Sequence, residues 1–307
     1  MARIVAERRA RNIGGLPMAC FPRPSRATER PRARWPAWVL AAAVAGLAGG
    51  CAGPRPGTTP GGVPIVVHDN AVGQDSRVLF LVIHYTVANL PLSMKILRDG
   101  GQVSSHYLVS DESPPRIHRL VPEERRAWHS GPSHWRGHAM LNAGSIGIEI
   151  VHPGFRDTPE GREWPPFPAE QVEAVVALVK DIVRRHGIRP ERIVGHSDVL
   201  PQHKQDPGPA FPWKRLADEG LIPWPDAGRV AAHRARFEAQ LPEVAWFQRT
   251  LRTHGFEVPQ HGELDAATRN VLVAFQMRHR PARFDGVPDA ETAALLHVLT
   301  TPEPRAR

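Results

Sequence analysis

The stretch Ile193-Val-Gly-His196-Ser-Asp198-Val-Leu-Pro201-Gln-His-Lys204-Gln-Asp206-Pro-Gly208-Pro carries a dense set of reactive side chains. Its first residues are apolar and predict a short buried strand that ends at His196. The polar, proline-rich segment that follows predicts a loop that brings Lys204 and Asp206 back towards the end of that strand. The stretch therefore predicts a functional site at a strand end.

A second strand ends in the same way, because the apolar run Val78-Leu-Phe-Leu-Val-Ile83 leads directly into His84. Two imidazoles and one carboxylate are ligands that Zn²⁺ prefers, and three protein ligands leave a fourth position for water, as in catalytic zinc sites. The pattern predicts a zinc site that includes His84 and His196. Spacing alone leaves Asp198 and Asp206 as alternatives for the carboxylate ligand.

The segments around these strands alternate between strand and helix patterns. The run at 78–83 is apolar on both faces and predicts a central strand. Further strands are expected at 103–109, 116–121, 145–151 and 192–195, with helices at 90–99 and 169–186, and a weak edge strand at 63–68. Residues 63–225 therefore predict one α/β domain, with a mixed central β-sheet flanked by helices.

Two of these elements are informative in detail. The segment 169–186 repeats valine and isoleucine at helical spacing and is followed by Gly187, which suits a left-handed helix end. In the strand 145–151, three isoleucines share one face, whereas Glu149 lies on the other. A carboxylate in a buried strand is costly unless it has a task. Glu149 is therefore a candidate functional residue.

A second domain follows the proline-rich boundary at 223–225. Residues 226–242 predict a connecting helix or linker, and residues 243–300 predict a small all-α domain of three helices. Within it, Gly262-Glu-Leu-Asp265-Ala-Ala-Thr268 is echoed by Gly286-Val-Pro-Asp289-Ala-Glu-Thr292, each with an aspartate as a helix N-cap. No catalytic cluster is visible there, so binding is the expected role. Deletion of 243–307 is expected to spare hydrolysis of small fragments.

The excess of positive charge lies in the first 50 residues. Nine of the 39 Lys and Arg residues but only two of the 31 acidic residues occur there, so the remaining chain is nearly neutral. Binding to the phosphate backbone requires clustered basic side chains in the folded part. The charge pattern therefore argues against a nucleic-acid partner and indicates a targeting segment.

The targeting segment has the order of a signal peptide. A basic region at 30–34 precedes an apolar region at 38–47 that is too short to span a bilayer. Leu47-Ala-Gly-Gly-Cys51 resembles the lipobox of bacterial lipoproteins, which implies removal of residues 1–50 and lipidation of Cys51. Ordinary secretion with cleavage near Cys51, or an uncleaved anchor, are the alternatives. Residues 51–62 predict a flexible tether, and Ala52 fits export to the periplasmic face of the outer membrane.

Several separate motifs, in one order, resemble those of the zinc-dependent N-acetylmuramoyl-L-alanine amidases of the AmiD and AmpD type, most closely the lipoprotein branch. The likeness runs from about Val78 to the C-terminus, where the helical domain resembles a peptidoglycan-binding module. The motifs are Val82-Ile-His-Tyr-Thr86, Ser104-Ser-His-Tyr-Leu108, Ala127-Trp-His129, Trp135-Arg-Gly137, Ser145-Ile-Gly-Ile-Glu149 and Lys204-Gln-Asp-Pro-Gly-Pro209.

The resemblance implies a role for each candidate residue. The zinc ligands would be His84, His196 and Asp206, so that Asp206 is favoured over Asp198. Glu149 would be the catalytic carboxylate, Lys204 would stabilise the charge developing on the attacked carbonyl, and Tyr85 and Thr86 would line the substrate groove. The implied reaction is hydrolysis of the amide bond between N-acetylmuramic acid and the L-alanine of the stem peptide, with the 1,6-anhydro form of the sugar as a further candidate substrate.

Other function classes fit less well. The chain lacks the His-Glu-x-x-His pattern of zincin proteases, and Ala143-Gly-Ser-Ile-Gly147 departs from a nucleophile elbow at its first residue. Cys20 lies in the segment expected to be removed and Cys51 would carry lipid, so neither is a nucleophile or forms a disulfide. A non-catalytic peptidoglycan-recognition or tethering protein of the same fold is the alternative, although such relatives lose zinc ligands that this chain retains.

Overall fold

The computed structural model describes residues 57–69, 71–159 and 161–301. The chain divides between Val72 and Gly73 into two compact units. The expected signal peptide, Cys51 and residues 51–56 of the expected tether lie outside the described residues. In the described part of the first unit, an isolated bridge joins Thr58 to Pro64, and residues 63–68 contain no strand. The predicted edge strand is therefore wrong, in keeping with the missing N–H group of Pro64.

The second unit is built on a five-stranded sheet with the order β3-β2-β6-β1-β9. Strand β1 lies between β6 and β9, parallel to both, as expected for its apolar sequence. Strand β2 is parallel to β6, whereas β3 is antiparallel to β2. The predicted mixed sheet is thus confirmed. Its strands are β1 Phe80–Tyr85, β2 Tyr107–Val109, β3 Ile117–Arg119, β6 Ser145–Ile150 and β9 Ile193–Gly195.

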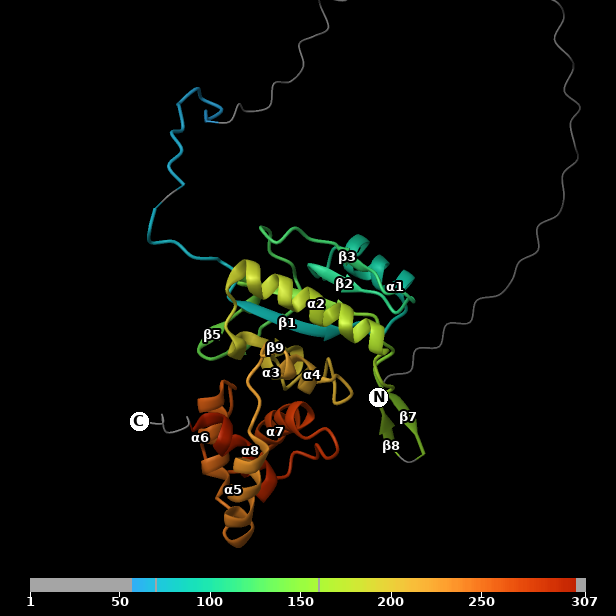
Figure 1. Ribbon diagram of the computed structural model, residues 1–307, viewed down its shortest axis with the longest axis vertical. Helices are drawn as coiled ribbons and strands as arrows, with labels where there is room; N and C mark the ends of the chain where they lie inside the picture. The colour runs from blue at the N-terminus through green and yellow to red at the C-terminus, as the bar shows by residue number, and fades with distance from the viewer. Residues whose placement is uncertain (1–56, 70, 160, 302–307) are drawn as a thin grey trace, which may run out of the picture. The chain divides into compact units, whose positions relative to one another are not determined.

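The remaining elements are helices and two small hairpins (Figure 1). The hairpins pair β4 His134–Trp135 with β5 His138–Ala139, and β7 Arg156–Thr158 with β8 Gly161–Glu163. The α-helices are α1 Leu90–Met94, α2 Ala169–His186, α3 His196–Val199, α4 Trp213–Asp218, α5 Ala227–Ala239, α6 Val244–His254, α7 Ala266–His279 and α8 Ala290–Thr300. A π-helical segment, η1 Lys95–Asp99, continues α1, and single 3-10 turns lie at η2 Leu141–Ala143 and η3 Pro190–Arg192.

Helix α2 covers one face of the sheet (Figure 1). Its bounds match the predicted range, and it ends at Gly187, whose φ of 65° is readily adopted by glycine. Val179 and Ile182 of the helix pack with Leu81 and Ile148 of the sheet, all of them fully buried. Burial of each such side chain stabilises the fold by roughly 1.5–3 kcal/mol. The valine and isoleucine repeat thus determines which face of the helix packs against the sheet.

The C-terminal helices pack against part of the opposite face of the sheet, at β1 and β9. Phe80 and Val82 of β1 and Val194 of β9 belong to one apolar cluster with buried side chains of α6, α7 and α8. The helices α6 to α8 were all predicted, and both predicted caps are present. Asp265 Oδ1 accepts a hydrogen bond from the Thr268 N–H (2.7 Å), and Asp289 Oδ1 accepts one from the Thr292 N–H (2.8 Å).

The segment predicted as a connecting helix or linker is the helix α5, which packs on α8. The ring centroids of His233 and His297 are 4.3 Å apart, and Phe237 is buried in the apolar cluster of the C-terminal helices. Helices α5 to α8, residues 227–300, together form the C-terminal module. No helix in the described part of the chain has the length and apolar character needed to cross a membrane.

Candidate active site

The three predicted zinc ligands come from the ends of two neighbouring strands and the loop beyond them. His84 is the penultimate residue of β1, and His196 begins α3 directly after β9. Asp206 lies in the turn that returns to this edge, where its carbonyl oxygen accepts a hydrogen bond from the Ser197 N–H (2.8 Å). The parallel pairing of β1 with β9 and this backbone contact bring the three side chains together.

The donor atoms of these side chains converge on one point. The Nδ1 atoms of His84 and His196 are 3.0 Å apart, and they lie 3.0 Å and 3.1 Å from Asp206 Oδ2. The three atoms all lie within 4.8 Å of one another, and the two imidazoles are buried. Two nitrogen atoms and one carboxylate oxygen form a donor set suited to Zn²⁺ with an open coordination position. The residues present therefore fit a zinc ion.

The electrostatics favour the protonation states that metal binding requires. Burial, together with the neighbouring His196, lowers the pKa of His84 to about 4. Burial alone would raise the pKa of Asp206, but the charge and hydrogen bonds of His196 and His84 more than offset it and hold this pKa below its ordinary value. At neutral pH the site thus presents a neutral His84 and an ionised Asp206, as metal ligands must be.

His84 has a hydrogen-bonded partner behind it. Its Nε2 lies 3.0 Å from His129 Nδ1, and His129 Nε2 lies 3.1 Å from Ser145 Oγ. With Nδ1 as the metal-binding atom, Nε2 would carry the proton and donate a hydrogen bond to His129 Nδ1. The ring of His129 lies against Gly147, where a Cβ atom would be 2.6 Å from His129 Cγ. The absence of a side chain at Gly147 is therefore what gives His129 its place.

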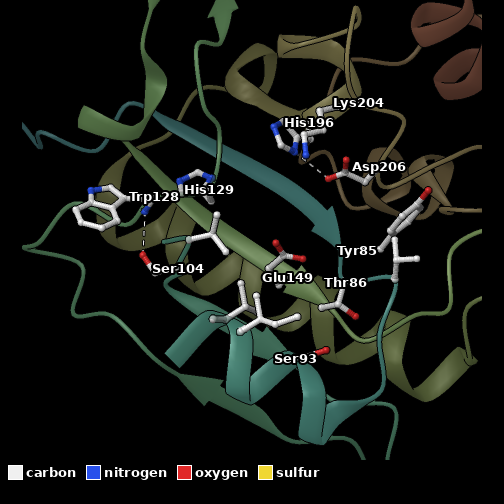
Figure 2. A pocket seen from close by; sticks show the side chains of 14 residues that line it. Tyr85, Thr86, Ser93, Ser104, Trp128, His129, Glu149, His196, Lys204 and Asp206 are labelled. Carbon is white, nitrogen blue, oxygen red and sulfur yellow. Dashed lines mark hydrogen bonds and ion pairs between the residues drawn. The ribbon is translucent and has the colours of Figure 1, made fainter. Parts of the chain in front are cut away.

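Glu149 lies beside the ligands on the same sheet face. It is the register partner of His84 across β1 and β6, and its Oε2 has no hydrogen-bond partner among the described residues. Burial first, and then the charge of Asp206, raises the pKa of Glu149 to about 8, although Lys204 partly opposes this shift. Figure 2 shows the carboxyl group pointing into the pocket. A carboxyl group with such a pKa is suited to proton transfer near neutral pH.

A cavity of about 260 Å³ opens over these groups (Figure 2). The predicted residues Tyr85, Thr86, Glu149, Lys204 and Asp206 all line it, together with His196. Tyr85 is buried, whereas Lys204 is exposed at the loop. The cavity thus brings a carboxyl group, an ammonium group and the metal-ligand cluster within one space.

The far wall of the cavity is apolar, and its aliphatic side chains were missed from the sequence. Val87, Ile96, Val103 and Trp128 line it with side chains that are 41 to 62% exposed. Trp128 is held by a reciprocal pair of backbone contacts to Ser104: its N–H donates to Ser104 Oγ (2.9 Å) and its carbonyl accepts from the Ser104 N–H (3.0 Å). Exposed apolar side chains gathered in one cavity indicate a ligand-binding surface.

The backbone of Val87 supports the same interpretation. Its φ of 51° lies in the left-handed region, which a β-branched residue rarely adopts. Strained residues of this kind concentrate at binding and catalytic sites. No feature of the sequence marks this conformation.

Asp198, the alternative ligand on spacing, points elsewhere. Its Oδ2 accepts a hydrogen bond from the Gly195 N–H (2.8 Å) and pairs with Arg278 Nη1 at 2.6 Å. It does not belong to the cluster of metal-ligating atoms found in the described residues. The carboxylate that joins the two histidines is that of Asp206.

Comparison with known proteins places the chain in context. The sequence profile of the N-acetylmuramoyl-L-alanine amidase family matches residues 74–209, and that of a peptidoglycan binding domain matches residues 240–296. The chain is 40% identical over 268 residues to the N-acetylmuramoyl-L-alanine amidase AmiD of Escherichia coli, covering 85% of this chain and 96% of that protein. It is also 40% identical over 98 residues to the 1,6-anhydro-N-acetylmuramyl-L-alanine amidase AmpD of Enterobacter cloacae, covering 32% and 48%.

Two solved structures resemble the fold over most of the chain. One is E. coli AmiD in complex with anhydro-N-acetylmuramic acid-L-Ala-D-γ-Glu-L-Lys, with a TM-score of 0.71 and 39% identity, covering 79% of this chain and 96% of that one. The other is AmpDh3 of Pseudomonas aeruginosa in complex with an anhydromuramic pentapeptide, with a TM-score of 0.69 and 38% identity, covering 75% and 94%. The likeness spans both the sheet and the C-terminal helices.

Proposed function

Because the chain belongs to the N-acetylmuramoyl-L-alanine amidase family, we propose that it is a zinc-dependent hydrolase of the amide bond between the lactyl group of N-acetylmuramic acid and L-alanine of the stem peptide. The observation that carries this proposal is the convergence of His84, His196 and Asp206 beside Glu149 in one cavity. The similarity to structures that hold anhydromuropeptides supports the same substrate class.

The three converging donor atoms would hold the zinc ion. Zinc in such a site polarises a carbonyl group and lowers the pKa of a coordinated water to about 7. The remaining chemistry falls to the side chains that line the cavity, each of which has a different charge and position.

Glu149 is the general base and acid of the proposed reaction. Its carboxylate takes a proton from the attacking water and then delivers it to the departing amine of L-alanine. Burial raises the pKa of Glu149 to about 8 in the protein without metal, and a neighbouring dication would shift it back towards neutral pH by stabilising the carboxylate. A group poised near the working pH serves well in both directions of proton transfer.

Lys204 supplies positive charge where the carbonyl oxygen becomes negative. Lys204 lies two residues before Asp206 and lines the cavity, and no ion pair within the described residues draws its ammonium group away. Removal of one such donor from a hydrolytic site costs about 3–4 kcal/mol of transition-state stabilisation. Tyr85 and Thr86 form the adjoining wall and would contact the stem peptide.

The C-terminal module and the N-terminal lipid anchor would hold the active site close to the cell wall. A peptidoglycan binding domain profile matches residues 240–296 of the C-terminal module, so we assign the module the binding of wall polymer. We further propose that Cys51 carries a lipid anchor that holds the enzyme at the periplasmic face of the outer membrane. A Cys51→Ser protein would then be recovered in the soluble fraction of cells, whereas the unchanged chain would sediment with membranes.

The direct test of the activity uses residues 52–307 and purified anhydromuropeptide. Release of free stem peptide that stops on addition of a chelator supports the proposal. Tight binding of the muropeptide without release of peptide would instead favour a recognition protein of the same fold.

A further inference from the structure

Helix α7 of the C-terminal module contacts the segment that carries His196. The guanidinium group of Arg278 donates from Nη1 to Asp198 Oδ2 (2.6 Å) and from Nη2 to the carbonyl oxygen of Ile193 (3.1 Å). It also lies over the ring of Trp213, with Cζ 4.1 Å from the ring centroid. Both partners of the ion pair are buried. One side chain thus ties α7 to the residues on either side of His196.

The carboxylate of Asp198 extends this contact to the start of α3. The same Oδ2 atom that meets Arg278 accepts the N–H of Gly195, the N-cap residue of the helix. Arg278 therefore joins the end of β9, through Ile193, to the first turn of α3, through Asp198. His196 lies at the bend between these two points, so the ion pair fixes the direction in which its side chain leaves the backbone.

His196 depends on this backbone constraint more than His84 does. The Nε2 of His84 has His129 as its hydrogen-bond partner, whereas the Nε2 of His196 is buried without a partner among the described residues. A metal-ligating histidine is usually oriented by a hydrogen bond to its second nitrogen. Because His196 lacks one in the described structure, its orientation is set by the bend that Arg278 and Asp198 hold.

A second contact joins α7 to the loop between His196 and Asp206. The amide of Gln202 donates to the carbonyl oxygen of Ala267 (3.1 Å) and accepts from Asn270 Nδ2 (2.9 Å). Helix α7 thus contacts the segment between His196 and Asp206 at two places. Ala267 and Asn270 lie near the start of the helix, and Arg278 lies near its end. These contacts lie alongside the apolar cluster that joins Phe80 and Val82 of the sheet to the same module.

We propose that Arg278 is a positioning residue for His196, and that the C-terminal module is part of the scaffold of the metal site as well as a wall-binding unit. The inference rests on the proposed zinc amidase function. It also revises the expectation that deletion of 243–307 spares hydrolysis of small fragments. That deletion removes Arg278, leaves the buried Asp198 carboxylate unpaired and uncovers one apolar face of the sheet.

The test compares Arg278→Met with Arg280→Met in the full-length exported chain, residues 52–307. Arg280 is also buried in the module, but it pairs with Asp289 and Glu291 of the module itself. Both substitutions break a buried ion pair and lower Tm. Only Arg278→Met is expected to weaken zinc binding, by about tenfold to hundredfold in a chelator competition, as for other residues that orient a metal ligand.

Two further readouts separate positioning from simple destabilisation. At saturating zinc, Arg278→Met is expected to lower kcat on a soluble muropeptide and to leave KM nearly unchanged, because the substrate walls are intact. Arg278→Lys keeps the charge near Asp198 but loses the second donor to Ile193. The zinc affinity of this variant should therefore fall between that of Arg278→Met and that of the unchanged chain.

The inference is overturned if Arg278→Met matches the unchanged chain in zinc affinity and kcat, or if Arg280→Met weakens zinc binding as much. Should Arg278→Met not fold, Asp198→Asn decides, because it keeps an acceptor for Gly195 and removes only the charge. Unchanged zinc affinity in that variant also overturns the inference. If the unchanged chain binds zinc but releases no peptide, the proposed function fails while the zinc comparison still stands.

Discussion

Glu149 on β6 is the register partner of His84 on β1, so the proposed proton-transfer group and one of the proposed metal ligands project side by side from the same face of the sheet. This relationship follows from the parallel pairing of β1 and β6. The other face of both strands packs against α2. It places the carboxyl group at the cavity without any contribution from a loop. The positions of these two side chains are therefore set by the pairing of central strands of the sheet.

Replacement of Glu149 by glutamine should abolish most of the activity. The amide has nearly the same shape but cannot accept and return a proton, so kcat should fall by about 10²–10⁴. Zinc content should remain that of the unchanged protein, because Glu149 is not among the converging donor atoms. Hydrolysis at the original rate would show that another group transfers the proton.

The same substitution should change how stability depends on pH in the metal-free protein. The pKa of Glu149 is raised to about 8 by burial, so its folded form holds a proton that the unfolded chain releases from about pH 4.5 upwards. The contribution of Glu149 to the free energy of unfolding is therefore fully present below pH 4.5 and is lost as the pH rises through 8.

Glu149→Gln removes this loss, so the variant should gain stability over the unchanged protein as the pH increases. The gain should reach at most about 5 kcal/mol at pH 9, since the pKa is raised from 4.5 to about 8 and one pKa unit corresponds to about 1.4 kcal/mol. Urea unfolding of both metal-free proteins at pH 5 and pH 9 measures the difference. Equal differences at the two pH values would contradict the raised pKa.

Lys204→Met should lower kcat without a comparable effect on zinc binding. The methionine retains much of the side-chain volume but removes the charge that faces the cavity, so kcat should fall by about 10²–10³. Lys214 is a matched control, since it is an exposed lysine of α4 that pairs with Asp218 away from the cavity. Equal activity of the Lys204→Met and Lys214→Met proteins would exclude the proposed role of Lys204.

His129→Ala should weaken zinc binding, because it removes the acceptor for the Nε2 proton of His84. Loss of such a partner typically lowers metal affinity by about 10- to 100-fold. Gly147→Ala should act in the same direction, since its Cβ would displace the ring of His129. His261→Ala, an exposed histidine of the C-terminal module, serves as the control. A zinc affinity unaffected by His129→Ala would assign that residue to packing alone.

Local patterns were sufficient to predict the elements whose own sequence decides their structure. Helix α2 was predicted to the residue because its apolar repeat and Gly187 define both its buried face and its end. The helix caps Asp265 and Asp289 were also readable, because each bonds a residue three positions away. The predicted helix at 90–99 carries Leu92, Ile96 and Leu97, but of these three side chains only that of Leu97 is buried. Ile96 lines the cavity instead, a task that periodicity does not reveal.

Features that depend on distant contacts could not be read from the sequence. Asp198 and Asp206 are both close to His196 along the chain, and only the fold shows that Asp198 pairs with Arg278, 80 residues later. The partner of His84, His129, is likewise separated from it by 45 residues. The raised pKa of Glu149 depends on burial between strands and on Asp206, neither of which is a local property.

The central claim is that His84, His196 and Asp206 hold one zinc ion that the hydrolysis of the muramyl–alanine amide requires. Metal analysis of the purified 52–307 chain, combined with digestion of an anhydromuropeptide before and after chelation, tests it most directly. We predict about one zinc per chain, loss of peptide release with the metal, recovery on adding zinc, and neither zinc nor activity in Asp206→Ala. Full activity of a protein from which all metal has been removed would contradict the account.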